Sequence, residues 1–466
     1  MTGPAATRYR LDSTWQRPGD GRTVIGGSPL RLFRLSPGGA HVIAQVEAGD
    51  PPATAAVTQL LDRFVDAGAL HPAPVAGRGL FTADDVTVVM PCYAANPLPP
   101  TGVPVVVVVD DASPRPVTLR PGTPPSGPGA GPELRLVTIR HDANRGPGAA
   151  RNTGLAEVAT PLVAFVDTDV TLPDGWLEPL LAHFADPRVA LVAPRVASAP
   201  GPGPTAGYEE RHSPLDLGDE PARVQPGTRV SYVPSAVVLC RADVVRALGG
   251  FDEDLRFGED VDLVWRLLAA GHRARYEPAV VVLHAPRPDW PSLWRQRRNY
   301  GRSAAPLAQR HPGALAPVRM SGWSLAVWLL VAARRPLAAA AVAAGTSAAL
   351  VRTLRSLPPS TAAHLAAMGH LAAGRQLAEG LRRVWWPLAL PALFTRNGRR
   401  VVAAAVTVPS LVEAARRRSP RPLADLPAQV AEEVAYGVGV WEGVAAAHCA
   451  GPLLPALSGW PRRDDR

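Results

Sequence analysis

Two aspartates separated by a single residue, Asp167 and Asp169, give the clearest chemical signal in the chain. They directly follow Leu162–Val166, an apolar run typical of a buried strand. At an extended strand end, residues i and i+2 point to the same side of the backbone, so the two carboxylates can share one divalent cation. Such a cation can bridge two phosphate groups. A solvated turn is the alternative for an isolated Asp-x-Asp pair, but the preceding strand favours a Mn²⁺ or Mg²⁺ site.

A second segment, Asn144–Gly154, combines small residues with two arginines. Its glycines and alanines make a slim helix start that a nucleotide can approach, and Arg145 and Arg151 offer planar donors to phosphate or a base carbonyl. Taken alone, these residues would equally suit a surface helix with solvated arginines. The segment lacks the Gly-Lys-Ser/Thr of a Walker loop, and no third glycine follows Gly146 and Gly148 at the spacing of a dinucleotide-binding turn. The segment is therefore neither a Walker phosphate-binding loop nor a dinucleotide-binding turn.

A third segment is strongly acidic. Six of the eleven residues from Asp252 to Asp262 are acidic, and Leu263–Leu267 continues as an apolar helical pattern. A carboxylate at a helix start is favoured by the helix dipole, so Asp260 or Asp262 could simply cap the helix. The functional interpretation makes one of these carboxylates a general base for an acceptor hydroxyl.

The elements that must position these groups are four apolar, β-branched runs: Val86–Met90, Val105–Val109, Leu134–Ile139 and Leu162–Val166. Such runs suit the buried strands of a parallel sheet. Each ends in polar or turn-forming residues, and ligands of open α/β sheets bind beyond the carboxyl ends of the strands. The sequence therefore predicts an α/β fold whose polar clusters converge on one crevice.

As an ordered set, these motifs resemble the family 2 glycosyltransferases of the GT-A fold, which have a Rossmann-like, mainly parallel sheet. The resemblance rests on Val86–Tyr93, Val107–Ser113, Asn144–Gly154, Asp167–Asp169 and Phe251–Arg266, and it assigns residues 84–310 to the catalytic domain. It implies a nucleotide pocket lined by Pro91 and Tyr93, with Asp110 or Asp111 holding the uracil or ribose and Arg151 fixing the nucleotide.

The same resemblance implies roles for the acidic groups. Asp167 and Asp169 would carry the metal ion and the diphosphate. Asp260 would be the base of an inverting displacement, and Glu259 would orient the acceptor. His284, after an apolar run, is either a further metal ligand or a structural histidine.

The chain departs from the family pattern in three places. Cys92–Pro104 and residues 112–133 are Pro- and Gly-rich connections where the family has helices. A parallel crossover needs roughly a dozen residues, so the first connection is barely long enough. Gln296–Tyr300 does not match the Gln-x-x-Arg-Trp of processive members, which leaves indefinite processivity unsupported.

The sequence predicts a small separate domain over residues 8–73. Tyr9–Gln16 and Thr23–Leu35 carry β-type patterns, and helical patterns follow at Ser36–Glu47 and Thr54–Ala67. Ser36 and the following proline suit a helix start. This order resembles the PqqD-like winged-helix domains, which recognise precursor peptides, and a generic winged-helix packing module is the alternative.

Residues 313–466 are Ala-rich and predicted to be helical. Trp323–Ala333 and Pro336–Val351 are apolar, but Arg334 and Arg335 lie between them, and neither piece reaches the roughly 20 residues of a membrane span. A buried helical hairpin, or a segment lying on an anionic membrane surface, is favoured over a true span.

The composition limits the class of protein, its compartment and its partners. The 466 residues carry a formal charge of +9 and are 47% hydrophobic, which allows a packed core despite 52 prolines and 42 glycines. Three widely spaced cysteines argue against a secreted disulfide scaffold, and the N-terminus has no signal-peptide pattern. We therefore expect a cytoplasmic protein; association with the inner face of the cell membrane goes with the alternative in which the apolar segments lie on a membrane surface. Nucleic acid is not expected as a partner, since no nucleic-acid motif accompanies the arginines.

The combination of a PqqD-like domain, a family 2 domain and an Ala-rich tail resembles the glycosyltransferases of the mycofactocin system. That resemblance implies transfer of glucose from a nucleotide sugar, UDP-glucose, to a peptide-derived redox cofactor or its precursor, giving β-1,4-linked chains. It also implies a peptide contact through the N-terminal domain. Two alternatives stay open: a family 2 enzyme acting on a lipid-linked or cell-wall glycan, and a non-catalytic binding protein.

Overall fold

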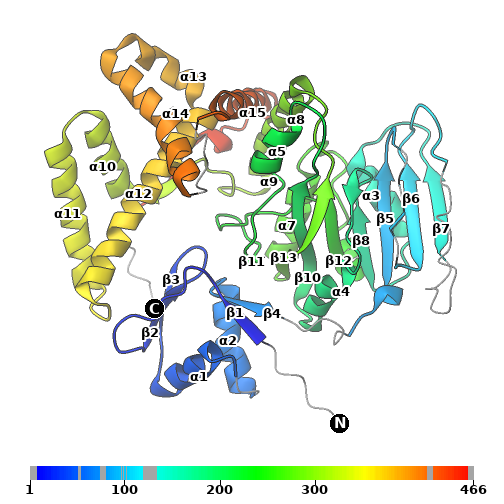
Figure 1. Cartoon of the computed structure of the whole chain (residues 1–466), viewed down its shortest axis with the longest axis horizontal. Coiled ribbons are helices and arrows are strands. Elements are labelled where there is room, and N and C mark those ends of the chain that lie inside the picture. The colour runs from blue at the N-terminus through cyan, green and yellow to red at the C-terminus, as the bar shows by residue number, and fades with distance from the viewer. Residues whose placement is uncertain are drawn as a thin grey trace. The chain divides into compact units, whose positions relative to one another are not determined.

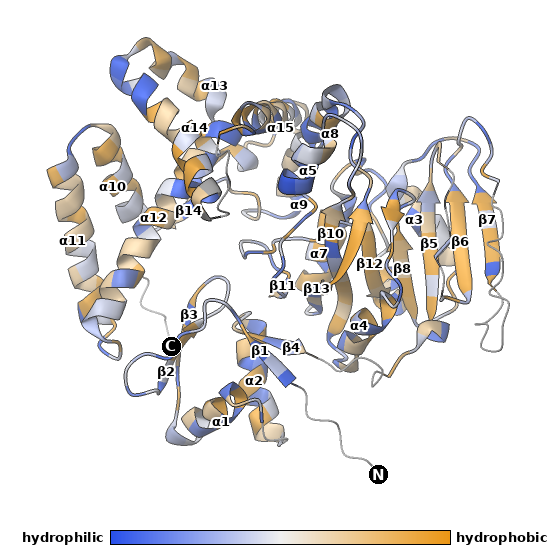
Figure 2. Ribbon diagram, in the orientation of Figure 1, coloured by the Kyte–Doolittle hydropathy of each residue, from blue (hydrophilic) through white to orange (hydrophobic). Residues whose placement is uncertain are grey.

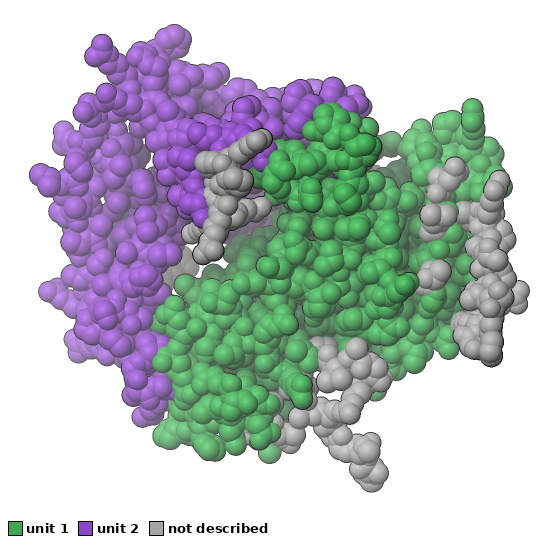
Figure 3. Space-filling model, in the orientation of Figure 1, with its two compact units in different colours: residues 1–17, 24–288 green, residues 18–23, 289–466 purple. Residues whose placement is uncertain are grey.

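The computed structural model describes residues 8–50, 54–73, 80–95, 97, 99–100, 102–118, 134–416 and 423–459. The chain divides into two compact units, shown in different colours in Figure 3. The first comprises Met1–Arg17 and Val24–Pro288, and the second comprises Pro18–Thr23 and Asp289–Arg466. The division after Pro288 differs from the expected end of the catalytic domain at residue 310.

The N-terminal domain has four short strands and two helices. They are β1 (Arg8–Leu11), β2 (Thr23–Gly26), β3 (Arg31–Arg34), α1 (Pro37–Glu47), α2 (Ala55–Asp66) and β4 (Leu70–Ala73). Ser36 accepts a hydrogen bond from the backbone N–H of Gly39 and caps α1, as its position before a proline predicts. The β-type segment Thr23–Leu35 contains two strands, β2 and β3, which form a hairpin, and Gly27 has a φ of +94° in the turn between them. Whether this domain is PqqD-like stays a prediction.

The catalytic part of the first unit is an α/β domain (Figure 1). Its strands are β5 (Val86–Cys92), β6 (Val105–Asp110), β7 (Arg135–Arg140), β8 (Leu162–Val166), β9 (Val170–Thr171), β10 (Val189–Ser198), β11 (Ala222–Arg223), β12 (Val237–Arg241) and β13 (Arg273–His284). Its helices are α3 (Pro147–Ala156), α4 (Leu177–Leu181), α5 (Ala206–His212), α6 (Ala242–Ala247) and α7 (Glu259–Ala269), with short 3₁₀ turns at Ala83–Asp85 and Ala182–Ala185. All four strands expected from the apolar runs are therefore confirmed.

The sheet is mixed, with most strands running the same way. Its order is β11-β13-β10-β12-β8-β5-β6-β7, and β9 pairs with β13 outside this path. Six of the nine strands share one direction: β5, β6, β7, β8, β10 and β13. The antiparallel β12 between β8 and β10 joins two parallel blocks. The expected Rossmann-like, mainly parallel sheet is confirmed.

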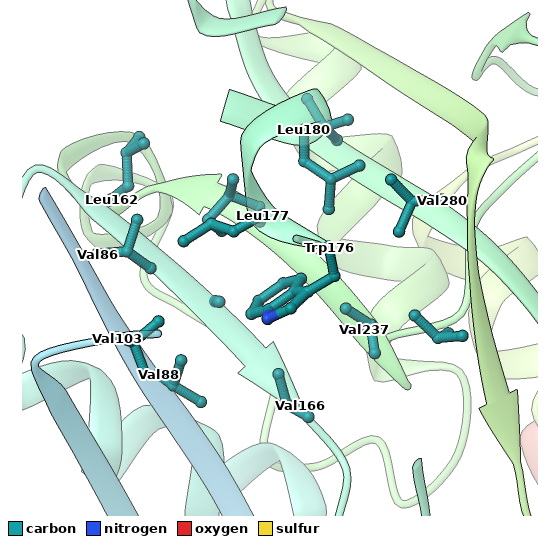
Figure 4. Packing of buried hydrophobic residues seen from close by; sticks show 14 of the residues in the cluster. Val86, Val88, Val103, Leu162, Val166, Trp176, Leu177, Leu180, Val237 and Val280 are labelled. Atoms are coloured by element: carbon teal, nitrogen blue, oxygen red, sulfur yellow. The ribbon is translucent and has the colours of Figure 1, made fainter. Parts of the chain in front are cut away.

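The core of this domain forms where apolar strands meet α4 and the loop before it. Figure 4 shows the Trp176 ring among Val88, Val166 and Val237, all of them buried. Figure 2 colours β5 and β6 mainly as hydrophobic strands, in keeping with their burial. These strands are covered on both faces, which explains their continuous rather than alternating apolar pattern.

The connection from β5 to β6 is a loop. Within the described part of residues 93–104 there is no helix, and the two strands it joins are parallel neighbours. In the second Pro- and Gly-rich connection, residues 112–118 are likewise non-helical, while 119–133 lie outside the described residues. Both departures from the family pattern hold wherever the structure describes these loops.

Ion pairs attach the N-terminal domain to the catalytic domain. Arg273, the first residue of β13, contacts Asp186 at 2.6 Å and reaches Asp62 and Asp66 of α2 at 3.2 and 2.5 Å. A second contact joins Arg229 to the buried Asp12 at 3.1 Å. The two domains thus form one compact unit.

The second unit is mainly helical. It contains α8 (Trp290–Arg302), α9 (Ala304–Arg310), β14 (Arg319–Ser321), α10 (Gly322–Ala332), α11 (Pro336–Thr353), α12 (Pro359–Arg383), α13 (Trp386–Ala389), the 3₁₀ turn η3 (Leu390–Phe394), α14 (Arg396–Arg416), α15 (Leu426–Ala447), the 3₁₀ turn Gly451–Leu453 and β15 (Ala456–Ser458). His370 of α12 ties two neighbouring helices together, because its ring nitrogens lie 3.0 Å from Ser324 Oγ of α10 and 2.8 Å from Thr346 Oγ1 of α11.

The two apolar segments of this unit form the helices α10 and α11, broken at Arg334 and Arg335. By length and composition, one described helix could cross a membrane: Pro336–Thr353, with a mean hydropathy of 1.2. Only Ala339 and Thr346 of α11 are buried. The interpretation as a buried hairpin was therefore wrong, and the membrane-surface and spanning alternatives remain.

Candidate active site

One arginine joins the Asp-x-Asp segment to the acidic helix start. The guanidinium of Arg151, on α3, contacts Asp167 Oδ1 at 2.7 Å through one terminal nitrogen and Glu259 Oε1 at 2.8 Å through the other. Its side chain is only 3% exposed. The carboxyl end of β8 and the first turn of α7 therefore lie within reach of one guanidinium.

Local sequence explains why α3 delivers Arg151 to this place. Pro147 opens the helix, and Gly154 packs so closely on β5 that a methyl group there would overlap the Val89 side chain. Asp111 holds the preceding loop by accepting the backbone N–H groups of Arg145 and Gly146, both at 2.8 Å. The small residues of this segment thus serve close helix-to-strand packing.

The start of α7 presents two adjacent carboxyl groups in different environments. Glu259 is buried, and burial, together with the neighbouring Asp260, raises its pKa to about 7, although Arg151 acts in the opposite direction. Asp260 is only half-buried, and its oxygens accept the backbone N–H groups of Ser235 at 3.2 Å and Val261 at 2.8 Å. Asp260 is thus the more accessible of the two and remains the candidate base. Glu259 contacts Arg151, and its expected contact with an acceptor stays a prediction.

Asp169 and His284 are brought together by a short antiparallel pairing of β9 with the end of β13, where Val170 lies opposite His284. The backbone N–H of Ala285 donates to the Asp169 carbonyl at 2.9 Å. As a result, His284 Nε2 lies 3.3 Å from Asp169 Oδ2. The other ring nitrogen, Nδ1, lies 2.9 Å from the Ala285 carbonyl oxygen, which can only accept a hydrogen bond. In the neutral ring Nδ1 therefore carries the proton, and the lone pair of Nε2 faces Asp169.

This arrangement suits a divalent cation whose other ligands come from a substrate. Metal-bound histidines commonly donate their second ring N–H to a backbone carbonyl, as His284 does. The described residues contain no group of three or more His, Cys, Asp or Glu side chains able to hold a metal ion. Mg²⁺ typically takes one or two carboxylates together with substrate phosphates, so the Asp169 carboxylate fits that kind of site.

Asp167 is placed differently from Asp169. One of its oxygens contacts Arg151, and burial raises the pKa of its carboxyl group, with Asp169 adding to the effect and Arg151 opposing it. Its side chain keeps 28% of its surface exposed, so it remains open to a ligand. In the structure, Asp167 therefore lies beside Arg151, and Asp169 lies beside His284.

The residues expected around the nucleotide lie at the ends of β5 and β6. Tyr93 is 55% exposed, next to the half-buried Pro91. Asp110 is buried and accepts the backbone N–H groups of Ser113 at 2.9 Å and Val117 at 3.3 Å. It also contacts Arg140, while Asp111, equally buried, contacts His141 at 2.8 Å. Both aspartates thus order the loops at the sheet edge, and a direct nucleotide contact by either stays a prediction.

Sequence reasoning missed Arg287. Its guanidinium lies 3.5 Å from both Asp169 Oδ2 and His284 Nε2. Its backbone is held by the buried Glu209, which accepts the Arg287 N–H at 2.5 Å, and by Thr205, which donates to the Arg287 carbonyl. The only signal in the sequence is its position three residues after His284. Glu209 lies far earlier in the chain, and no pattern marks it.

Removing Arg151 should be costly. In Arg151→Met, Asp167 and Glu259 lose their buried partner, and breaking a buried pair from one side typically costs about 3–5 kcal/mol of unfolding free energy. Arg145→Met is the matched control, because Arg145 forms an exposed pair with Glu253 that should contribute about 0–1 kcal/mol. Urea denaturation of both variants measures the difference, and equal losses would contradict the bridging role of Arg151.

The mixed sheet, the carboxylates at its edge and a sequence match define the class of protein. Residues 105–246 match the profile of Glycosyl transferase family 2. The chain belongs to the family 2 glycosyltransferases and is an enzyme rather than a non-catalytic binding protein.

A relative matches nearly the whole chain. It is the pre-mycofactocin glycosyltransferase of Mycobacterium tuberculosis, 41% identical over an alignment of 476 positions that covers 97% of this chain and 98% of the relative. The glycosyltransferase AglE of Haloferax volcanii is 27% identical over 42% of this chain and 61% of its own length. Among solved structures, a mannosyltransferase from Pyrobaculum calidifontis in complex with GDP-Man and Mn²⁺ is 18% identical and covers 80% of this chain and 90% of its own, with a TM-score of 0.40.

Proposed function

We propose that the enzyme transfers glucose from UDP-glucose to the peptide-derived redox cofactor mycofactocin or its precursor, building β-1,4-linked chains with inversion at the anomeric carbon. The observation that carries the proposal is the 41% identity with a pre-mycofactocin glycosyltransferase across 97% of this chain. The match is not confined to the catalytic domain; it also takes in the N-terminal domain and the helical unit.

Asp260 is proposed as the general base. Its carboxylate takes the proton of an acceptor hydroxyl, whose oxygen forms the new bond to the anomeric carbon. The bond from that carbon to the diphosphate oxygen breaks at the same time, and the nucleoside diphosphate leaves with the bonding electrons. Attack from the face opposite the leaving group inverts the configuration.

The leaving diphosphate needs positive charge beside it. Asp167, Asp169 and His284 would hold a Mn²⁺ or Mg²⁺ ion, which would neutralise charge on the diphosphate. Arg287 lies 3.5 Å from Asp169 Oδ2 and adds a permanent positive charge there. Pro91, Tyr93, Asp110 and Asp111 are proposed to line the nucleotide pocket.

The other parts of the chain are proposed to hold and locate the acceptor. Residues 8–73, as a PqqD-like domain, would contact the peptide part of the acceptor or its precursor. Residues 313–466 would associate with anionic lipid at the inner face of the cell membrane, which makes the enzyme cytoplasmic and peripheral. No step of this proposal involves nucleic acid.

A lipid-linked or cell-wall glycan is the alternative acceptor. The observation that favours it is α11, Pro336–Thr353, which is long and apolar enough to cross a membrane and is mostly unburied. Such a helix would hold the enzyme at the membrane in which a lipid-linked acceptor is anchored.

Incubation of the purified enzyme with UDP-glucose and pre-mycofactocin tests the proposal. Mass spectrometry should detect products spaced by one hexose less one water, and their digestion by a β-1,4-specific glucosidase would report the linkage. A parallel reaction with a polyprenyl-phosphate sugar tests the alternative. Transfer to the lipid acceptor alone would reject the mycofactocin assignment while leaving the catalytic residues in place.

A further inference from the structure

Part of the helical unit carries a large excess of positive charge. Between residues 290 and 412 the sequence contains sixteen arginines and a single acidic residue, Glu379. A surface of this kind attracts anions over a distance set by the ionic strength. Charge alone does not identify the anionic partner. The position of apolar side chains among the arginines distinguishes one kind of partner from another.

Large apolar side chains are exposed at two turns of this unit. Next to the turn between α10 and α11, in the first turn of α11, Leu337 is 87% exposed. In the turn formed by α13 and η3, Phe394 is 90% exposed and Leu388 is 64% exposed. Exposure of several large apolar side chains in one area marks an interaction site on a soluble surface.

The two turns lie side by side. Asn397, at the start of α14, donates from Nδ2 to the carbonyl oxygen of Ala332 at the end of α10, at 2.7 Å. Figure 1 shows both turns at the same end of the helical unit. The exposed apolar side chains of the two turns therefore belong to one surface.

Arginines flank the apolar side chains on this surface. Arg334 and Arg335 lie in the first turn, and Arg396 and Arg400 lie just after the second, all four of them exposed. Arg399 donates to the Leu393 carbonyl at 3.0 Å, which holds another guanidinium at the edge of the second turn. None of these five arginines forms an ion pair within the part of the chain that the structure describes.

We propose that this surface, the arginine-flanked tip, docks the enzyme on an anionic bilayer, with Leu337, Leu388 and Phe394 entering the headgroup boundary and Arg335, Arg396 and Arg400 contacting lipid phosphates. Apolar side chains at the acyl boundary with cationic side chains beside them are the recognised arrangement of interfacial binding. The proposal gives a binding surface to the peripheral location proposed above and rests on that part of the proposed function only.

Vesicle co-sedimentation tests the tip without donor or acceptor, so its outcome is separate from that of the transfer reaction. The wild-type chain should bind phosphatidylcholine vesicles containing phosphatidylglycerol, with weaker binding as salt is added, and should not bind pure phosphatidylcholine. Arg396→Gln/Arg400→Gln should weaken binding by about 30-fold, because each arginine near an anionic surface contributes roughly fivefold. Leu388→Ser/Phe394→Ser should weaken it by about tenfold or more.

Matched controls lie elsewhere on the same unit. Arg352→Gln/Arg355→Gln removes the same charge near the opposite end of α11, and Leu371→Ser alters an exposed side chain of α12. Both should bind like the wild type, and thermal unfolding should show that all variants remain folded. Equal losses in the control and tip variants, or equal binding to neutral vesicles, would overturn the proposal. The proposal would also be overturned if the wild-type chain did not bind vesicles but bound RNA or formed a dimer, and if the tip variants abolished that interaction.

Discussion

Replacing Asp260 by Asn should lower the rate of glycosyl transfer by about 10²–10⁴-fold, the usual contribution of a positioned general base. The amide has nearly the size of the carboxylate and its oxygen can still accept the Ser235 N–H, which contacts Asp260 at 3.2 Å. It cannot take the acceptor proton. Nucleotide-sugar binding should therefore stay close to that of the wild type, and the loss should fall on kcat.

Asp254→Asn is the matched control for this variant. Asp254 lies in the same acidic run, and its side chain is exposed, so the same change of acid to amide should leave transfer unchanged. Initial rates and calorimetric binding of the nucleotide sugar should be measured on both proteins. Full activity of Asp260→Asn would remove Asp260 from the role of base, and Glu259→Gln would then be the next variant to examine.

The Asp167→Ala/Asp169→Ala variant should lose metal-dependent nucleotide binding, with an affinity about 100-fold or more below that of the wild type. Charge stabilisation of a diphosphate by a bound cation is worth several kcal/mol, and this variant removes both carboxylates of the strand end. Calorimetry with UDP should be run with Mn²⁺ and with EDTA. Wild-type binding that is the same in both conditions would show the metal site to be wrong.

Asp174→Ala controls for loss of negative charge in the same region, since Asp174 is exposed in the loop after β9. His284→Ala should give a smaller loss than the double variant, because Asp169 remains. An unaltered affinity in His284→Ala would favour the interpretation of His284 as a structural histidine. Thermal unfolding of each variant separates loss of binding from loss of fold.

The strands could be predicted from the sequence because their chemistry is local. Runs such as Val105–Val109 are apolar and β-branched throughout, so burial on both faces is visible in one window. The prediction from sequence did not divide Thr23–Leu35 into two strands, although Gly26-Gly27-Ser28-Pro29 between them is a turn signal. Both arms suit a strand, and the β-type pattern of the arms outweighed that signal.

The site was partly predictable. Asp167 and Asp169 follow a recognisable strand and Asp260 lies at a recognisable helix start, and the structure places Arg151 between groups of these two segments. The partners of that arginine were not predictable, because Glu259 lies 108 positions away. Arg287 was missed for the same reason: its support comes from Glu209, 78 positions earlier, through a backbone contact that leaves no periodicity.

Strand β13 has Arg273 at one end and His284 at the other. The first residue is fastened to the N-terminal domain by Asp62 and Asp66, and the last faces Asp169. Beside Arg273, burial lowers the pKa of Arg275 to about 10, with Arg273 adding to the effect. The small domain therefore helps to anchor the strand that carries the histidine: without it, Arg273 would keep its contact with Asp186 but would lose its contacts with Asp62 and Asp66.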